Sequence, residues 1–220
     1  MGRMMGHAGM AAIAVRCLRS TGSPARTAQP RDPSPRPRLR AVRADEPPPP
    51  TPEEFRNVLG HFASGVTVIT APGEGREPPA GFACQSFCSL SLDPPLVAFM
   101  VGRSSTSWPR IARAGVFCAN ILGSGQKDLC RGFATRSSQT ADKFAGVAHE
   151  PSPVTGSPRL ADAPAWVDCT IHAVHTGGDH LIVVGRVEAL GADPSAADAG
   201  PLLFHRGAFG AFDAFGTYDG

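Results

Sequence analysis

The sequence lacks any uninterrupted apolar run near the ~20 residues that a membrane-spanning helix requires. AGMAAIAV, near its start, is too short for such a helix. Six cysteines are present, but they form no C-x-x-C pair and do not cluster as in a small secreted domain. We therefore expect reduced thiols, a cytoplasmic protein and no membrane partner.

Several signatures of catalysis are also absent. There is no Rossmann-type G-x-G-x-x-G motif, no nucleophile elbow, no Ser-His-Asp order and no evident pair of catalytic carboxylates. His172 and His175 have H-x-x-H spacing, which on a strand does not bring two imidazoles onto one metal, so we expect no metal site. His180 follows Asp179 at a loop tip and is better suited to holding or protonating a ligand.

The excess positive charge of the chain is confined to its first 50 residues. The formal net charge is +2, but residues 1–50 contain nine arginines and only three acidic residues. Residues 51–220 contain twelve basic and sixteen acidic residues, a net charge near −4. Because nucleic-acid binding requires a basic surface, we expect no nucleic-acid partner.

Composition divides the chain into three parts. Residues 1–50 form an Arg/Pro/Ala-rich leader without apolar periodicity, which we expect to be disordered. Its apolar start, flanked by arginines, has some features of a targeting segment but no convincing cleavage site. A single domain is expected over residues 51–210, followed by a short flexible tail over residues 211–220.

The domain is predicted to begin with a helix. T-P-E-E at residues 51–54 is a capping box, and the apolar residues that follow recur with helical spacing. This stripe consists of Phe55, Val58, Leu59 and Phe62.

Most of the other apolar runs are predicted to be strands, because they are short, β-branched and bounded by turn residues. They cover residues 66–70, 80–91, 96–101, 116–122, 165–175, 180–190 and 201–207. Short helices are expected before Gly115 and over residues 125–134, while residues 147–164 have an irregular composition. Many strands, a hairpin turn at Thr176–Asp179 and no βαβ rhythm predict a mostly β fold, an antiparallel barrel with short flanking helices.

One predicted strand is unusually polar. GFACQSFCSLSLDPPLV, residues 81–97, is apolar enough to be buried, yet it contains Gln85 and three serines. Strand alternation puts Phe82, Cys84 and Ser86 on one face, and Gly81, Ala83 and Gln85 on the other. Buried polar groups need partners, so either backbone carbonyls satisfy them or a flat heteroaromatic ligand approaches the small Gly81 and Ala83. The residues alone leave both explanations open.

A second polar cluster follows the next strand. Arg103, Ser104, Ser105, Thr106 and Ser107 lie at the start of a predicted helix and offer hydroxyls and backbone amides in one place. Such a cluster is a workable phosphate site. It also contains residues that cap helices, although capping accounts for one hydroxyl and not for four.

Taken together, these segments resemble the flavin reductase-like family, small NAD(P)H:flavin oxidoreductases that supply reduced flavin to two-component monooxygenases. The resemblance runs from Phe55 to Gly207 and is carried by FRNVLGHFASGVTVIT, GFACQSFCSLSLDPPLV, GRSSTSW, GVFCANIL, DKFAGV, VHTGGDHLIVVGRVEAL and LLFHRG, in this order. Motifs such as GSPRL and VDCTI look most like the branch whose partner hydroxylates a phenolic secosteroid in bacterial cholesterol degradation.

The resemblance implies a split β-barrel, Greek-key-like and FMN-binding in its relatives, which forms a homodimer with the flavin near the subunit interface. It implies FMN or FAD as cofactor, NADH or NADPH as hydride donor, and a partner oxygenase reached by diffusible reduced flavin. Hydride transfer requires stacking geometry and no nucleophile, which fits the missing triad.

The resemblance also implies site residues. The flavin-binding set is Pro79, Ala80, Gly81, Phe82, Ala83, Gln85, Ser86, Ser91, Arg103, Ser104, Ser105, Thr106, Ser107 and Asn120. The nicotinamide-binding set is His180, Phe204, His205 and Arg206, of which His180 is the candidate catalytic residue. Position 204 is Phe where many relatives carry Tyr, so the preference between NADH and NADPH stays open.

Two other interpretations use the same barrel. One is a non-catalytic protein that stores or senses flavin or haem. The other is an enzyme like pyridoxamine-phosphate oxidase, whose phosphate site uses several Arg and Lys, whereas this chain has only two lysines, Lys127 and Lys143.

Overall fold

The computed structural model describes residues 48–135, 142–197 and 200–211. The predicted leader and flexible tail lie almost entirely outside these described ranges. The helices are α2 (Pro52–Leu59), α3 (Trp108–Ala114), η1 (Ser124–Gln126), α4 (Lys127–Ala134) and α5 (Pro194–Ala197). The strands are β1 (Ser64–Gly65), β2 (Thr67–Ala71), β3 (Ala80–Cys84), β4 (Cys88–Leu92), β5 (Pro95–Gly102), β6 (Val116–Ile121), β7 (His149–Pro151), β8 (Pro158–Leu160), β9 (Ala165–Gly177), β10 (His180–Ala192), β11 (Leu202–His205) and β12 (Ala208–Ala211).

Seven antiparallel strands form the main sheet, in the order β3-β2-β6-β9-β10-β5-β4. Its centre is the long β9–β10 hairpin, which turns at Gly178 and Asp179, where Gly178 has a φ of 67°. The sheet curls so that β3, at one end, approaches β5, near the other. The Ser86 hydroxyl joins them, because it donates to the Met100 carbonyl at 3.1 Å and accepts from the Met100 amide at 2.8 Å. The expected mostly β barrel with short flanking helices is confirmed.

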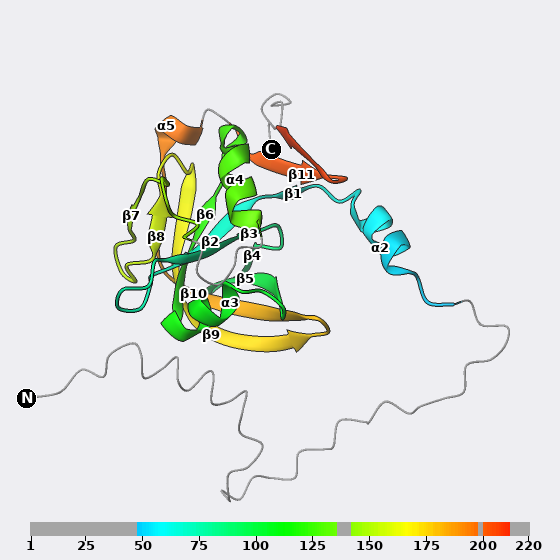
Figure 1. Ribbon diagram of the computed structural model, residues 1–220, viewed down its shortest axis with the longest axis horizontal. Coiled ribbons are helices and arrows are strands. Elements are labelled where there is room, and N and C mark those ends of the chain that lie inside the picture. Colours follow the sequence, from blue (N-terminus) through cyan, green and yellow to red (C-terminus); the bar gives the residue numbers. More distant parts are fainter. Residues whose placement is uncertain (1–47, 136–141, 198–199, 212–220) are drawn as a thin grey trace, which may run out of the picture.

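Two apolar clusters fill the barrel and the space under its helices. The first surrounds Phe99, whose ring meets those of Phe117 and Trp108 edge to face at centroid distances of 5.1 and 6.3 Å. Such tilted aromatic pairs add to the free energy of burial. The second lies between α4 and the sheet, where Phe133 and Phe144 pack edge to face at 5.1 Å. Helix α3 packs on β2 and β6, and α4 on β2 and β3 (Figure 1).

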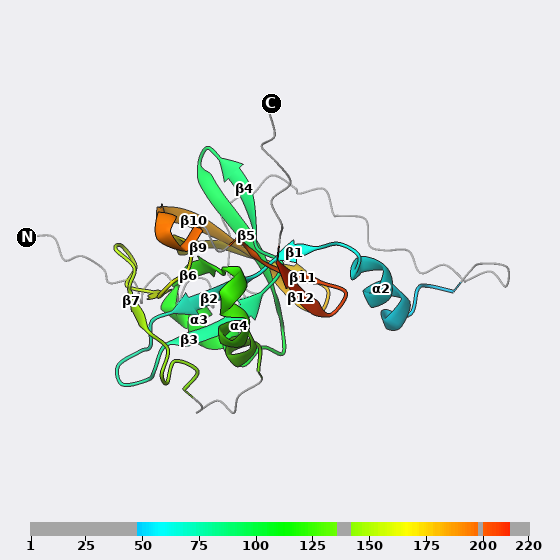
Figure 2. The same ribbon diagram turned by 90° about the horizontal axis from the view of Figure 1, so that it is seen from above.

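Helix α2 lies apart from the barrel. Its capping box is confirmed, since Thr51 Oγ1 accepts from the Glu54 amide and the Glu54 carboxylate accepts from the Thr51 amide. None of its residues is buried, and it stands away from the main sheet in both views (Figures 1 and 2). The chain after α2 is tied down where the Gly60 carbonyl accepts from the Arg206 amide at 3.0 Å.

Two predictions of local structure are wrong in detail. The expected strand at residues 80–91 is two strands, β3 and β4, on opposite ends of the main sheet, so its alternation does not run through. Residues 147–164 are not entirely irregular, because β7 and β8 pair there. Strand β12, at the end of the described residues, pairs with β11 in a small sheet. No helix in the described residues is long and apolar enough to cross a membrane.

Candidate active site

A cleft of about 460 Å³ opens between the ends of β3 and β5 and the start of α3. We call it the central cleft. It is lined by Phe82, Ala83, Cys84, Gln85, Ser86, Met100, Val101, Gly102, Ser104, Ser105, Thr106, Ser107, Phe133, Ala134, Thr135, Lys143 and His180. The fold thus brings together nine of the residues that the resemblance implied, from three separate segments: Phe82, Ala83, Gln85, Ser86, Ser104, Ser105, Thr106, Ser107 and His180.

The hydroxyl cluster before α3 is only partly used by the protein itself. Ser105 Oγ accepts from the Trp108 amide at 3.3 Å and so caps the helix. Ser107 Oγ donates to the Gly81 carbonyl at 2.9 Å and ties the helix to β3. The side chains of Ser104 and Thr106 make no hydrogen bond within the described residues. Two cleft hydroxyls are therefore available to a polar ligand.

Gly81 is required for the packing of the core. A Cβ at this position would lie 2.8 Å from Cε1 of Phe133, a buried ring, and 3.2 Å from the Ile69 carbonyl oxygen. Real Cβ contacts are not that short, so a side chain here would displace the core. Packing is thus a sufficient reason for a glycine at position 81, and its neighbours Phe82 and Ala83 line the cleft.

The polar side chains within residues 81–97 are less buried than expected from the apolar character of this segment. Gln85 is exposed at the cleft, and Ser91 is half-buried on the edge strand β4, outside the cleft lining. Ser86 is half-buried, and its hydroxyl is satisfied by the Met100 backbone. Backbone groups thus account for Ser86, whereas the Gln85 amide makes no hydrogen bond within the described chain.

His180 enters the cleft from the start of β10. Its Nδ1 lies 2.7 Å from Asp179 Oδ1, a contact that orients the ring. The hydrogen bond from His180 holds the pKa of the Asp179 carboxyl below its usual range. A Cβ on Gly102 would lie 3.8 Å from His180 Nε2 and 4.0 Å from Ser104 Oγ, so Nε2 and the hydroxyl cluster face the same part of the cleft.

The remaining nicotinamide candidates lie around a second cavity of about 730 Å³. Phe204 and Arg206 line it together with residues of α2, among them Phe55 and Arg56. Gln85 lines both cavities and marks where they adjoin. His205 lines neither; it is exposed and meets the His61 ring edge to face at 6.2 Å.

Besides Gly81 and Ser91, four flavin candidates do not line the central cleft. Ala80 is buried, Pro79 is half-buried in the preceding loop, and Arg103 is exposed. Asn120 is fully buried, where its Nδ2 donates toward Val68 O, Thr70 Oγ1 and Pro158 O, and its Oδ1 accepts from the Leu160 amide. Its amide is thereby fully occupied.

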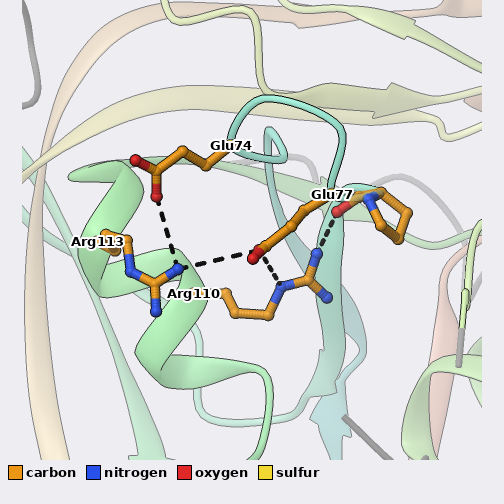
Figure 3. A network of polar contacts seen from close by, with 5 residues as sticks. Glu74, Glu77, Arg110 and Arg113 are labelled. Atoms are coloured by element: carbon orange, nitrogen blue, oxygen red, sulfur yellow. Dashed lines mark hydrogen bonds and ion pairs between the residues drawn. The ribbon is translucent and has the colours of Figure 1, made fainter. Parts of the chain in front are cut away.

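An ion-pair cluster holds the loop before β3 against α3 (Figure 3). The Arg110 Nε lies 3.5 Å from Glu77 Oε2, and its guanidinium also donates to the Pro78 carbonyl. Arg113 contacts both Glu74 and Glu77, at 3.5 and 3.9 Å. Because α3 follows the hydroxyl cluster and the loop leads into β3, these contacts fix two walls of the central cleft. Pattern reasoning missed the cluster, since E-G-R-E and R-I-A-R are far apart in sequence.

The cleft cysteine is not a nucleophile. Cys84 is buried, and burial raises the pKa of its thiol, which keeps it protonated. Burial likewise raises the pKa of Cys118 to about 12. Within the described ranges, no three His, Cys, Asp or Glu side chains gather closely enough to hold a metal ion. The cleft offers hydroxyls, an amide, an imidazole and an ammonium around an apolar floor, a set suited to binding a polar aromatic molecule.

Comparisons with known proteins agree with this geometry. The family model "Flavin reductase like domain" matches residues 59–213. The chain is 46% identical over 158 residues to the "flavin-dependent monooxygenase, reductase subunit HsaB" of Rhodococcus jostii, which covers 72% of this chain and 76% of that protein.

Solved structures have the same fold. A homologue of nitrilotriacetate monooxygenase component B from Mycobacterium thermoresistibile superposes with a TM-score of 0.68 at 44% identity, covering 76% of this chain and 93% of that one. The NADH:FAD oxidoreductase SgcE6 of Streptomyces globisporus, in complex with NAD and FAD fragments, superposes with a TM-score of 0.66 at 35% identity, covering 73% and 92%.

Proposed function

Since this chain belongs to the flavin reductase-like family, we propose that it is an NAD(P)H-dependent flavin reductase, which reduces FMN or FAD and supplies the reduced flavin to a separate monooxygenase. The observation that carries the proposal is the central cleft, where the hydroxyl cluster, the β3 wall and His180 meet. Relatives named as reductases, among them an NADH-dependent flavin reductase and an NADH:FAD oxidoreductase, support the same activity.

The central cleft fits a flavin by two observations. Gly102 leaves open the space between His180 and Ser104 that a Cβ would begin to fill. The free Ser104 and Thr106 hydroxyls and the Gln85 amide offer the mixture of donors and acceptors that an isoalloxazine and its phosphate require.

The protein's part in the reaction is to bind and orient two ligands. A bound flavin supplies the chemistry, since it accepts a hydride from the nicotinamide. Phe82, Ala83 and Gln85 form the wall for the ring system, and the hydroxyl cluster binds the phosphate end. His180, oriented by Asp179, binds the nicotinamide, which enters from the second cavity past Phe204 and Arg206.

The active protein is a homodimer whose interface includes α2. Apolar side chains on α2 and in the bend after it are exposed: Val58 on the helix at 65%, and Phe62, three residues past its end, at 81%. Leu92 on the edge strand β4 is 93% exposed. Large exposed apolar groups that gather on one helix are typical of an interface with another chain. Because α2 also lines the second cavity, dimer formation fixes the position of one wall of the cavity through which the nicotinamide enters.

The partner is an oxygenase that takes up diffusible reduced flavin. Its substrate is a phenolic compound, and the resemblance to subunits such as HsaB favours the secosteroid branch of the family. The pool of NADH in the cytoplasm would be the electron source, and a cytoplasmic location remains a prediction.

The test is a steady-state assay of nicotinamide oxidation at 340 nm, with FMN, FAD, NADH and NADPH varied in turn. We expect a rate that saturates in free flavin, as for a substrate, and that ranks the two flavins and the two nicotinamides. A protein that holds flavin tightly but does not oxidise either nicotinamide would instead be the non-catalytic binding protein.

A further inference from the structure

A small pocket lies at the end of α3 that is opposite to the hydroxyl cluster. Its volume is about 270 Å³, and Pro72, Ala114 and Val116 contribute to an apolar lining. We call it the α3 pocket. It shares no lining residue with the central cleft or the second cavity, so the proposed function makes no use of it.

The loop before β3 forms one wall of the α3 pocket and is closed on itself. The Glu77 amide donates to the Glu74 carbonyl at 3.0 Å, and a Cβ on Gly73 would overlap the Glu77 carbonyl oxygen. Because the turn is this tight, the backbone at these three positions, all of which line the pocket, is fixed.

Thr155, from the turn between β7 and β8, forms another wall. A fully buried carboxylate holds this turn, since Asp168 accepts from the Val154 and Thr155 amides at 3.1 and 3.0 Å and from the Thr155 hydroxyl. Interactions within the protein thus fix both walls. Sites for small molecules are usually pre-formed in this way.

Arg113 lines the α3 pocket with a guanidinium that the protein itself uses little. Only its Nη1 makes contacts, with Glu74 at 3.5 Å and Glu77 at 3.9 Å (Figure 3). Both distances exceed the roughly 2.7–2.9 Å of a charge-assisted hydrogen bond. Its Nε and Nη2 make no hydrogen bond within the described residues. Such exposed ion pairs contribute little to stability, so the guanidinium is available to an anion.

An apolar pocket with one available guanidinium favours a flat ring that carries a single carboxylate. Arginine binds a carboxylate through two parallel hydrogen bonds. Glu74 and Glu77 line the same pocket, and their charges disfavour a ligand with several negative charges, such as a nucleotide. The volume lies just below the range of about 300–1,000 Å³ for typical ligand pockets, which limits the ligand to one or two fused rings.

We propose that the α3 pocket is an effector site, which binds a small aromatic carboxylate through Arg113 and thereby raises the affinity of the central cleft for flavin. A ligand in this pocket touches both α3 and the loop before β3, which also form two walls of the central cleft. It therefore adds to the contact of Arg110 with Glu77, which holds these walls together. The effect on flavin rests on the proposed function, whereas binding of the carboxylate does not.

The first measurement is made without flavin. Isothermal titration calorimetry compares the full-length protein with 2-naphthoate and with 2-naphthamide, which has the same shape but no charge. We expect 2-naphthoate to bind once for each chain and at least about tenfold more tightly than 2-naphthamide, as for a charge-assisted pair of hydrogen bonds. Arg113→Met should remove this difference.

Two further variants test the location of the site. Arg131→Met is the matched control, because Arg131 is also exposed and paired with a carboxylate, Asp128, but lines none of the three cavities. It should bind 2-naphthoate as the wild type does. Ala114→Leu fills the pocket, leaves Arg113 in place and should also prevent binding. Thermal melting checks that it is folded, and Arg113→Met answers the question if it is not.

The second measurement tests the coupling to flavin. Dissociation constants of FMN and FAD are measured by quenching of flavin fluorescence with and without saturating 2-naphthoate. In the wild type, 2-naphthoate should lower the constant of the tighter-binding flavin by at least about fivefold, and 2-naphthamide should not. In Arg113→Met neither compound should have an effect.

The outcomes separate this inference from the proposed function. No saturable binding of 2-naphthoate, equal binding by Arg113→Met, or displacement of 2-naphthoate by flavin would overturn the site. Binding through Arg113 that leaves both flavin constants unchanged would overturn the effector role. A protein that binds 2-naphthoate through Arg113 but neither binds flavin nor oxidises a nicotinamide would support the site and refute the proposed function.

Discussion

The single residue Asn120 stabilises the barrel by joining β6 to β2 and β8. Its amide nitrogen has two hydrogens for three acceptors on β2 and β8, and its oxygen accepts from Leu160. Asn120→Leu removes these bonds and leaves buried backbone groups unpaired. We expect a loss of about 3 kcal/mol in the free energy of unfolding, measured by urea denaturation, with flavin affinity nearly unchanged.

The family resemblance implied that Asn120 contacts flavin, and such a contact would have the opposite consequences for stability and flavin affinity. If Asn120 touches flavin directly, Asn120→Leu should weaken flavin binding strongly and change stability little. Asn57→Leu, at an exposed position, is the control. It shows how much the free energy of unfolding changes when a leucine replaces an asparagine that is not buried.

His180 is predicted to act on the nicotinamide. His180→Ala should raise the KM for NADH about fivefold, the loss of roughly one hydrogen bond, and change the flavin dissociation constant less. His175→Ala, on the same hairpin and exposed, should leave both constants unchanged. An unaltered KM for NADH in His180→Ala would show that the His180 imidazole does not bind the nicotinamide.

The sequence identified individual residues of the site better than it explained them. Ser104, Ser105, Thr106 and Ser107 line the cleft as expected, because a loop that follows a strand stays near that strand's end. Gly81 is small because the Phe133 ring packs on it, and nothing in the local pattern relates position 81 to position 133. The contributions of Lys143 and Phe133 to the cleft depend on tertiary packing, which a periodic pattern does not encode.

Among the elements, the ion-pair cluster between α3 and the loop before β3 is expected to contribute to both stability and flavin binding. The Arg110 side chain is only 22% exposed, whereas that of Arg113 is 55% exposed. Arg110→Met should lower the free energy of unfolding by about 1 kcal/mol and raise the KM for flavin, because the α3 hydroxyls lose their fixed distance from β3.

Arg113→Met is the matched control within the same ion-pair cluster. Exposed ion pairs contribute little, so its unfolding free energy should change by less than about 0.5 kcal/mol and its flavin KM should not change. Equal effects of the two substitutions on KM would mean that Arg110 has no special role in positioning α3.

Elements were predictable where the local signals were strong. Helix α2 has its capping box, α3 ends at Gly115 with a φ of 70°, and the β9–β10 hairpin turns at a glycine. The break between β3 and β4 was not visible, since CQSFC contains neither proline nor glycine. The chain leaves the sheet there because Ser86 bonds to β5 in place of a strand neighbour.

At the scale of the whole molecule, the exposed face of α2 predicts a dimer. Phe62→Asp places a charge in the proposed interface and should convert the dimer to a monomer at micromolar concentration, as measured by sedimentation velocity. Val154→Asp, at a residue that is 57% exposed on another part of the surface, should remain dimeric. A wild type that sediments as a monomer would refute the interface and leave the α2 stripe unexplained.

The central claim is that the protein reduces flavin that then leaves it. The most direct measurement mixes a catalytic amount of protein with NADH and a large excess of FMN or FAD without oxygen, and follows flavin absorbance at 450 nm. We expect nearly all of the flavin to be reduced, many equivalents for each protein chain. Reduction that stops at one equivalent for each chain, or does not occur, would contradict it.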